Sequence, residues 1–190
     1  GEHVLNGGMA RALAAAAGPA WVDKAQGILR EKLSLSVVPI DIDIPRKSLR
    51  LAAVVRTAGF SRDSRKVQQL GRQVEEALDA AEESKAARVV LPLLGTGNRG
   101  WPVPVVAQVL YAATSRFAPR ARSVREVAVL DVQADKVNAA AAAIKGMVEE
   151  AVPRPVSVGD MRGTTADTSL IDLSKMDLSH FVEGESDERR

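Results

Sequence analysis

A short apolar run that leads into a glycine-rich loop constrains the fold of this chain more than any other feature. Residues 89–94 are apolar almost throughout, which is typical of a β-strand that is covered on both faces. The loop of residues 95–101 follows, and the helical spacing of apolar residues resumes at Val103. A buried strand, a loop and a helix in this order indicate an α/β fold with parallel crossover connections.

The spacing of apolar residues divides the rest of the chain into helices and strands. A helix around residues 21–33 is expected to bury Trp21, Ala25, Ile28, Leu29 and Leu33 on one face. Pro39 favours a sheet edge or a bulge for the first strand. The other helices are predicted over residues 9–17, 65–84, 103–116 and 135–150, and the strands over residues 33–44, 49–57, 89–94 and 124–132.

Composition and charge exclude several kinds of function. The 26 lysines and arginines against 24 aspartates and glutamates leave a net charge of +2, too small a surplus to indicate nucleic-acid binding. Without cysteine the chain has no disulfide, thiolate metal site or cysteine nucleophile, and its two histidines, His3 and His180, stand near opposite ends. We therefore expect neither a metal nor a cofactor.

Hydropathy also bears on where the protein works. No apolar run reaches the ~18 residues that a membrane helix needs, and no signal peptide is visible. We therefore expect a soluble, cytoplasmic protein without membrane partners.

The composition changes after Val152. Residues 153–190 are rich in Pro, Gly, Ser, Thr and charged residues, which indicates a linker and a partly disordered tail behind one domain of residues 1–152. This tail either packs weakly on the domain or docks on a partner or on a second copy of the chain. The segment that suggests docking is an apolar island formed by Leu170, Ile171, Leu173, Met176, Leu178, Phe181 and Val182.

The loop Gly95-Thr96-Gly97-Asn98-Arg99-Gly100 has the composition of an anion-binding site. Glycines permit a positive φ and let the backbone approach a ligand closely, and we expect Gly97 to need such a φ. Successive unpaired N–H groups beside the positive end of a helix dipole are suited to phosphate. The alternative is a tight turn that needs its glycines for geometry alone.

The same loop matches the dinucleotide pattern G-x-G-x-x-G, but its surroundings favour another class. That pattern expects an acidic residue about 20 residues further on, whereas the next predicted strand ends later, at Asp131. Pro102 and Pro104 stand where the helix begins, and only one proline fits there easily. No lysine follows Gly100, so the loop is not a P-loop.

Two stretches of the chain resemble the ligand loops of macrodomains. Residues 89–102, Val-Val-Leu-Pro-Leu-Leu-Gly-Thr-Gly-Asn-Arg-Gly-Trp-Pro, resemble the apolar strand and diphosphate loop of that family. Residues 6–18, which begin Asn-Gly-Gly-Met-Ala and end Ala-Ala-Gly, resemble its glycine triplet and the helix that follows. Residues 126–131 and the helix behind them resemble its final strand and helix, so the resemblance covers about residues 3–150.

The resemblance implies a three-layer α/β/α sandwich with a mixed sheet, and a cleft for ADP-ribose or a related nucleotide. The amides of the glycine loop then hold the diphosphate, while the first loop faces the distal ribose. Trp101 either belongs to this site or packs in the core, and Arg99 either pairs with a phosphate or is solvated. The implied ligand-binding residues are Asn6, Gly7, Gly8 and Met9 together with Gly95, Thr96, Gly97, Asn98, Arg99, Gly100 and Trp101.

The sequence departs from the macrodomain pattern where function is concerned. Hydrolytic members carry an Asp at the position of Ala10, and a methyl group cannot orient water or take a proton. Asn6 replaces the first glycine of the triplet, and Arg99 replaces an aromatic residue. On this resemblance, we expect the family's first strands, with the acid that reads the adenine, to lie before residue 1. No catalytic residue is therefore assigned.

These features leave three functions open. The first is binding of ADP-ribose or a similar nucleotide, free or on an ADP-ribosylated protein, with weak or no catalysis. The second is an ADP-ribosyl hydrolase that acts on modified proteins, and the third is a degenerate macrodomain that serves as an interaction module. An open sheet edge and the tail also favour self-association or a partner chain.

Overall fold

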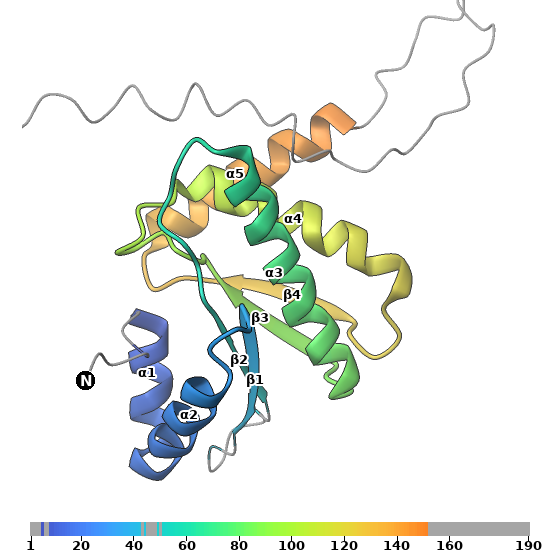
Figure 1. The fold of residues 1–190 in the computed structure, drawn as a ribbon. Helices are drawn as coiled ribbons and strands as arrows, with labels where there is room; N and C mark the ends of the chain where they lie inside the picture. Colours follow the sequence, from blue (N-terminus) through green and yellow to red (C-terminus); the bar gives the residue numbers. More distant parts are fainter. Residues whose placement is uncertain (1–4, 6–7, 43, 45–48, 50, 152–190) are drawn as a thin grey trace, which may run out of the picture.

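The computed structural model describes residues 5, 8–42, 44, 49 and 51–151, and its elements follow the predicted order (Figure 1). The tail of residues 153–190, with its apolar island, lies outside the described residues. The helices are α1 (Gly8–Ala17), α2 (Pro19–Glu31), α3 (Ser64–Glu83), α4 (Val103–Phe117) with the 3-10 turn η1 (Ala118–Arg120), and α5 (Ala134–Ala151). The strands are β1 (Val37–Asp41), β2 (Leu51–Val55), β3 (Arg88–Pro92) and β4 (Glu126–Leu130).

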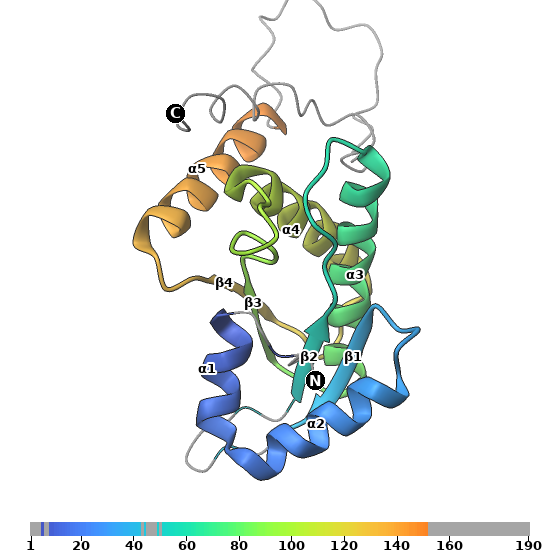
Figure 2. The ribbon, with the colours of Figure 1, turned by 60° about the vertical axis from the view of Figure 1, so that its left-hand side comes forward.

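The strands lie between two helical layers, as the predicted α/β/α arrangement requires (Figures 1 and 2). Helices α1 and α2 form one layer, and α3, α4 and α5 form the other. Strands β1 and β2 pair antiparallel, whereas β3 and β4 pair parallel. Both kinds of pairing occur, as in a mixed sheet, but among the described residues they form two separate two-stranded ladders. Within the same ranges, no helix has the length and apolarity to span a bilayer.

The first strand starts later than the sequence predicts. Residues 32–34 form a turn after α2, and β1 begins only at Val37. Leu33 and Leu35 are 71% and 46% exposed, so the prediction that they belong to a buried helix face and a buried strand face is wrong. The turn is stabilised because the amide of Leu35 donates to the carbonyl of Lys32 at 3.2 Å, which carries both leucines away from the core.

A first hydrophobic core joins α1 and α2 to one face of β1 and β2. In β1, Val38 and Ile40 are buried while Pro39 between them is exposed. Trp21 of α2 donates its indole N–H to the carbonyl of Asp41 at 3.0 Å, which fixes the helix to the end of the strand. The buried members of this N-terminal core are Leu5, Trp21, Ala25, Leu29, Val38, Ile40, Ile42, Ile44 and Ala52.

A second core lies between the layer of α3, α4 and α5 and one face of β3 and β4. Leu91 of β3 is 6% exposed, whereas its neighbour Val90 is 49% exposed. Among the described residues, β3 therefore packs through one face, and the prediction of a strand covered on both faces is wrong. The helices bury the faces that their spacing predicts: Val67, Leu70, Val74, Leu78 and Ala81 in α3, and Val106, Val109, Leu110 and Ala113 in α4.

Arg56, the residue after β2, ties the two cores together. Its guanidinium donates to the carbonyls of Leu29 and Leu33 at 2.6 and 2.7 Å, at the end of α2. Its amide donates to the carbonyl of Ser36 at 2.9 Å. From α3, the buried Gln73 donates its side-chain amide to the carbonyl of Arg56 at 3.0 Å. Arg56 thus links α2, the start of β1 and α3 to one another.

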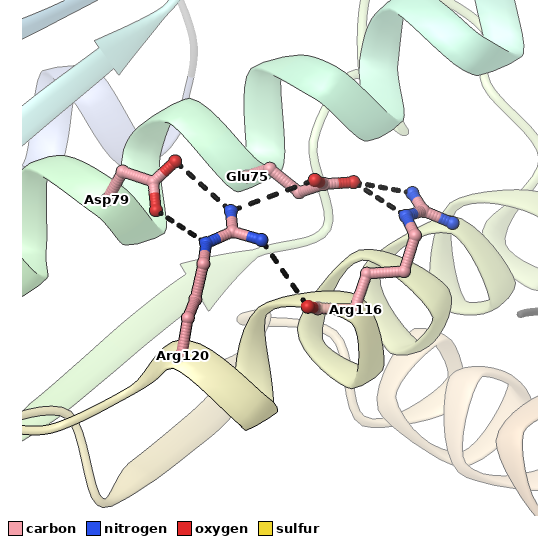
Figure 3. A network of polar contacts seen from close by, with 4 residues as sticks. All are labelled: Glu75, Asp79, Arg116 and Arg120. Carbon is pink, nitrogen blue, oxygen red and sulfur yellow. Dashed lines mark hydrogen bonds and ion pairs between the residues drawn. The ribbon is translucent and has the colours of Figure 1, made fainter.

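Four charged side chains connect α3 to α4 and η1 (Figure 3). Glu75 lies between two arginines: its carboxylate is 2.7 Å from Nη2 of Arg116 and 3.8 Å from Nη2 of Arg120. Arg120 also pairs with Asp79, one turn further along α3, through two contacts of 3.1 Å. Because the network links several charges and Glu75 and Arg116 are about three-quarters buried, it fixes the crossing of the two helices better than an exposed pair does.

A carboxylate at the end of α3 holds the start of the last strand. Glu82 accepts hydrogen bonds from the amides of Ser123 and Val124 at 2.7 and 3.0 Å. The amides of Val124 and then Ser123 favour the charged carboxylate and lower the pKa of Glu82 below its ordinary value of 4.5. A lowered pKa means that this interaction stabilises the fold above about pH 4.5 and is lost as the pH falls through the folded-state pKa.

We predict that Glu82→Gln lowers the free energy of unfolding at about pH 7. We also expect the free energy of unfolding to depend less on pH in the acid range. Gln keeps the shape but not the charge that the two amides stabilise. Urea unfolding at a series of pH values measures both effects. The matched control is Glu83→Gln, because Glu83 is exposed one position away. Equal acid dependence in the wild type and in Glu82→Gln would contradict the prediction.

Candidate functional site

Three segments that follow strands meet around the loop of residues 95–100. This loop follows β3, residues 56–60 follow β2, and the first turn of α5 follows β4. The amide of Phe60 donates to the carbonyl of Arg99 at 2.9 Å, and Nζ of Lys136 donates to the carbonyl of Thr96 at 3.2 Å. The loop is therefore held from two sides at the carboxyl ends of strands, which is where α/β folds bind ligands.

Two glycines give this loop its shape. The φ angle is +77° at Gly95 and +68° at Gly100, in the left-handed region that favours glycine. Gly97 has no positive φ, and a Cβ built on it would meet nothing within 4 Å. The expectation that Gly97 needs a positive φ is therefore wrong. The chain reverses at the two ends of the loop, which leaves its middle residues in ordinary conformations.

Trp101 forms the floor of the loop. The residue is 3% exposed and belongs to the second core. Its indole N–H donates to the carbonyl of Ala58 at 2.8 Å, and its ring meets Phe60 edge-on at a centroid distance of 5.3 Å. A Cβ added to Gly95 would lie 2.5 Å from Cδ1 of Trp101, closer than carbon atoms can approach. With the indole in this position, residue 95 has room only for glycine.

Four of the six carbonyl groups in the loop of residues 95–100 accept hydrogen bonds within the protein. Among the described residues, the amides of residues 97–99 donate to no acceptor, and these three residues are exposed. Successive N–H groups of this kind, with their carbonyls turned away, attract an anion. The carbonyls that accept hydrogen bonds from the body of the protein or from the loop itself are those of Gly95, Thr96, Gly97 and Arg99.

The side chains of the loop differ in how they are used. The hydroxyl of Thr96 donates to the carbonyl of Leu93 at 2.9 Å, which helps to close the turn. Asn98 and Arg99 are exposed. Across the part of the chain that the structure describes, no group of three or more His, Cys, Asp or Glu side chains is placed to hold a metal ion.

The second predicted wall of the site is only partly described. Asn6 and Gly7 lie outside the described residues. Gly8 is the first residue of α1, and Met9 is 37% exposed. In both views, the end of α1 where the helix begins points toward the loop after β3 (Figures 1 and 2). Ala10, the next residue of α1, packs against the N-terminal core.

Three residues of this site were not identified from the sequence. Ala58 and Phe60 receive and brace the indole of Trp101, and Lys136 reaches the loop from α5. Ala58 acts through its backbone carbonyl, which no side-chain pattern reveals. One signal could have suggested Lys136. It follows closely after a strand that is parallel to β3, and parallel strands bring their carboxyl ends together.

The structure thus places a glycine loop with unpaired central amides, among the described residues, at the carboxyl ends of strands in an α/β/α fold. Comparison with known proteins gives the family. The model for the Macro domain family matches residues 2–110, which is more than half of the chain. The chain belongs to the Macro domain family. No curated protein matches the sequence closely enough to be compared with it.

Solved macrodomains share the fold. A macrodomain variant from Oceanobacillus iheyensis with ADP-ribose has a TM-score of 0.67 and 18% identity, over 77% of this chain and 82% of that one. The same macrodomain with ADP has a TM-score of 0.67 and 18% identity, over 79% and 82%. The macro domain of ganglioside induced differentiation associated protein 2 has a TM-score of 0.55 and 13% identity, over 70% and 67%.

We predict that Gly95→Ala destabilises the protein by about 2–4 kcal/mol, since a methyl group there adds backbone strain to a collision with the indole. Gly97→Ala is the matched control and should change stability by less than about 1 kcal/mol, because its Cβ meets open space. Urea unfolding followed by tryptophan fluorescence measures both. If the two variants were equally stable, the indole would not be the floor of the loop.

Proposed function

We propose that this protein binds ADP-ribose, or a closely related nucleoside diphosphate, through the amides of residues 97–99. The observation that carries the proposal is the polarity of the loop. Four of its six carbonyls accept hydrogen bonds within the protein, and three successive exposed amides have no acceptor among the described residues. A diphosphate supplies several acceptor oxygens on adjacent phosphorus atoms, so it can take such amides together. Membership of the Macro domain family supports the same ligand.

The rest of the nucleotide would extend from the loop toward the start of α1. Gly8 and the exposed Met9 are the described residues of that wall, and Asn6 and Gly7 precede them. Asn98, Arg99 and Gly100 offer polar contacts at the loop itself, and Arg99 can add a charge-assisted bond to a phosphate. The natural ligand on this proposal is free ADP-ribose or the ADP-ribose carried by a modified protein.

Binding without hydrolysis is the activity that these residues support. Ala10 offers neither a base nor an acid, and it packs against the N-terminal core. Thr96 uses its hydroxyl in the turn, while Asn98 and Arg99 do not act as bases near neutral pH. The carboxylate of Asp131, at the end of β4, accepts the amide of Gln133 at 3.0 Å and serves the start of α5.

We predict that isothermal titration detects binding of ADP-ribose, and that Asn98→Pro weakens it about 10- to 100-fold by deleting one amide donor. Proline fits the backbone there, because the amide of Gly100 donates to the carbonyl of Gly97 at 3.0 Å and residue 98 is the second residue of that turn. Asn98→Ala keeps the amide and is the matched control.

Two results would contradict this proposal. One is a folded wild-type protein that takes up no ADP-ribose, ADP or NAD in the titration. The other is equal affinity of Asn98→Pro and Asn98→Ala, with unchanged tryptophan fluorescence in both, since the loop amides would then have no part in binding.

We further predict no appreciable release of ADP-ribose from mono-ADP-ribosylated protein. Acid–base assistance typically contributes ~10²–10⁴-fold to a rate, and the residue that provides it in hydrolytic relatives is replaced here by Ala10. Incubating the purified chain with a radiolabelled modified protein, beside a hydrolytic macrodomain as positive control, measures the rate. Turnover comparable to that control would show that another group supplies the chemistry.

A further inference from the structure

Lys136 is a charged side chain that reaches the candidate site and that neither the sequence motifs nor the proposed binding mode uses. It belongs to the first turn of α5, and its Nζ lies 3.2 Å from the carbonyl oxygen of Thr96. The side chain is partly buried. Through this hydrogen bond a charged side chain of α5 contacts the backbone of the glycine loop.

The backbone around Lys136 is fixed before its side chain extends. Asp131 accepts the amide of Gln133, and the carbonyl of Gln133 accepts the amides of Lys136 and Val137 at 3.1 and 3.2 Å. Further along α5, Ala140 is buried in the second core. These contacts hold the first turn of the helix against β4, so the lysine reaches the loop from a rigid base.

We infer that Lys136 is a positioning residue, which holds the Thr96–Gly97 peptide group so that the amide of Gly97 is presented to the ligand. A trans peptide group points its carbonyl and its N–H in opposite directions. By anchoring the carbonyl of Thr96 on the inner side, the ammonium therefore turns the N–H of Gly97 outward. Without that anchor a glycine peptide is free to rotate, because Gly97 has neither a side chain nor a crowded Cβ position.

The charge of Lys136 adds to its geometry. A hydrogen bond from a cation is stronger than one from a neutral donor, and it polarises the peptide group that accepts it. A polarised peptide is a better donor at its N–H end, so the charge strengthens the next bond to a phosphate oxygen. The lysine acts through the peptide group, and a direct contact between its ammonium and the ligand is not required.

This inference rests on the proposed binding of ADP-ribose for its functional meaning, but its structural part can be tested without a ligand. Three variants separate the contributions. Lys136→Met removes the donor and the charge, Lys136→Gln keeps a donor without the charge, and Lys136→Arg keeps both. The matched control is Lys145→Met on the same helix, where the lysine side chain is 76% exposed and pairs with Glu149 at 3.6 Å.

The experiment is a nitrogen–proton NMR spectrum of each ligand-free variant, followed by titration with ADP-ribose. We expect the Gly97 amide resonance to shift in Lys136→Met and to return toward the wild-type position in Lys136→Arg. Affinity for ADP-ribose should fall about fivefold in Lys136→Met, less in Lys136→Gln, and remain near the wild-type value in Lys136→Arg and Lys145→Met.

The possible outcomes separate the inference from the proposed function. An unchanged Gly97 resonance in Lys136→Met overturns the inference, whether or not any nucleotide binds. Equal affinity of Lys136→Met and the wild type for ADP-ribose overturns it as well and leaves the proposed function standing. A shifted Gly97 resonance in a protein that binds no ADP-ribose would support the positioning role and reject the proposed ligand.

Discussion

The contact between Gly95 and the indole of Trp101 is the constraint on which the candidate site depends. The indole occupies the space that a side chain at residue 95 would take, and its N–H is satisfied by the carbonyl of Ala58. This hydrogen bond brings the segment that follows β2 in the sequence against the segment that follows β3. The two strands themselves share no ladder among the described residues. With its floor and both ends held, the loop can leave three consecutive amides facing solvent.

Much of the fold is predictable from the sequence, because the helices carry their own signal. The 3.6-residue spacing in α3 and α4 identifies the buried residues one by one, since a regular helix turns each of them toward the same neighbour. The strands are less predictable. Leu33 and Leu35 continue an alternating pattern but lie in a turn, because Arg56 binds the carbonyls at the end of α2 from a distant part of the chain. Long-range contacts of this kind leave no local pattern.

The candidate site, like the fold, is predictable from the sequence only in part. Its glycine loop follows from composition, and the resemblance to macrodomains predicts a second wall at Gly8 and Met9, which stays a prediction. The sequence does not reveal which glycine lacks space for a side chain, because this depends on where the indole lies. A Cβ on Gly95 would meet the ring, whereas a Cβ on Gly97 would meet nothing within 4 Å. The part of Lys136 depends on the parallel pairing of β3 with β4, which brings residues 96 and 136 together across 40 positions of sequence.

The separation of the hydrophobic residues into two cores has a consequence for cooperativity. The start of α1 belongs to the N-terminal core, whereas Trp101 and the loop above it belong to the second core. The polar contacts of Arg56 and Gln73, together with the packing of α3 against β1 and β2, join the two cores. A molecule that touches both walls therefore acts as a non-covalent cross-link. Its binding energy adds to the coupling between the cores, because such a molecule binds only the state in which both walls are in place.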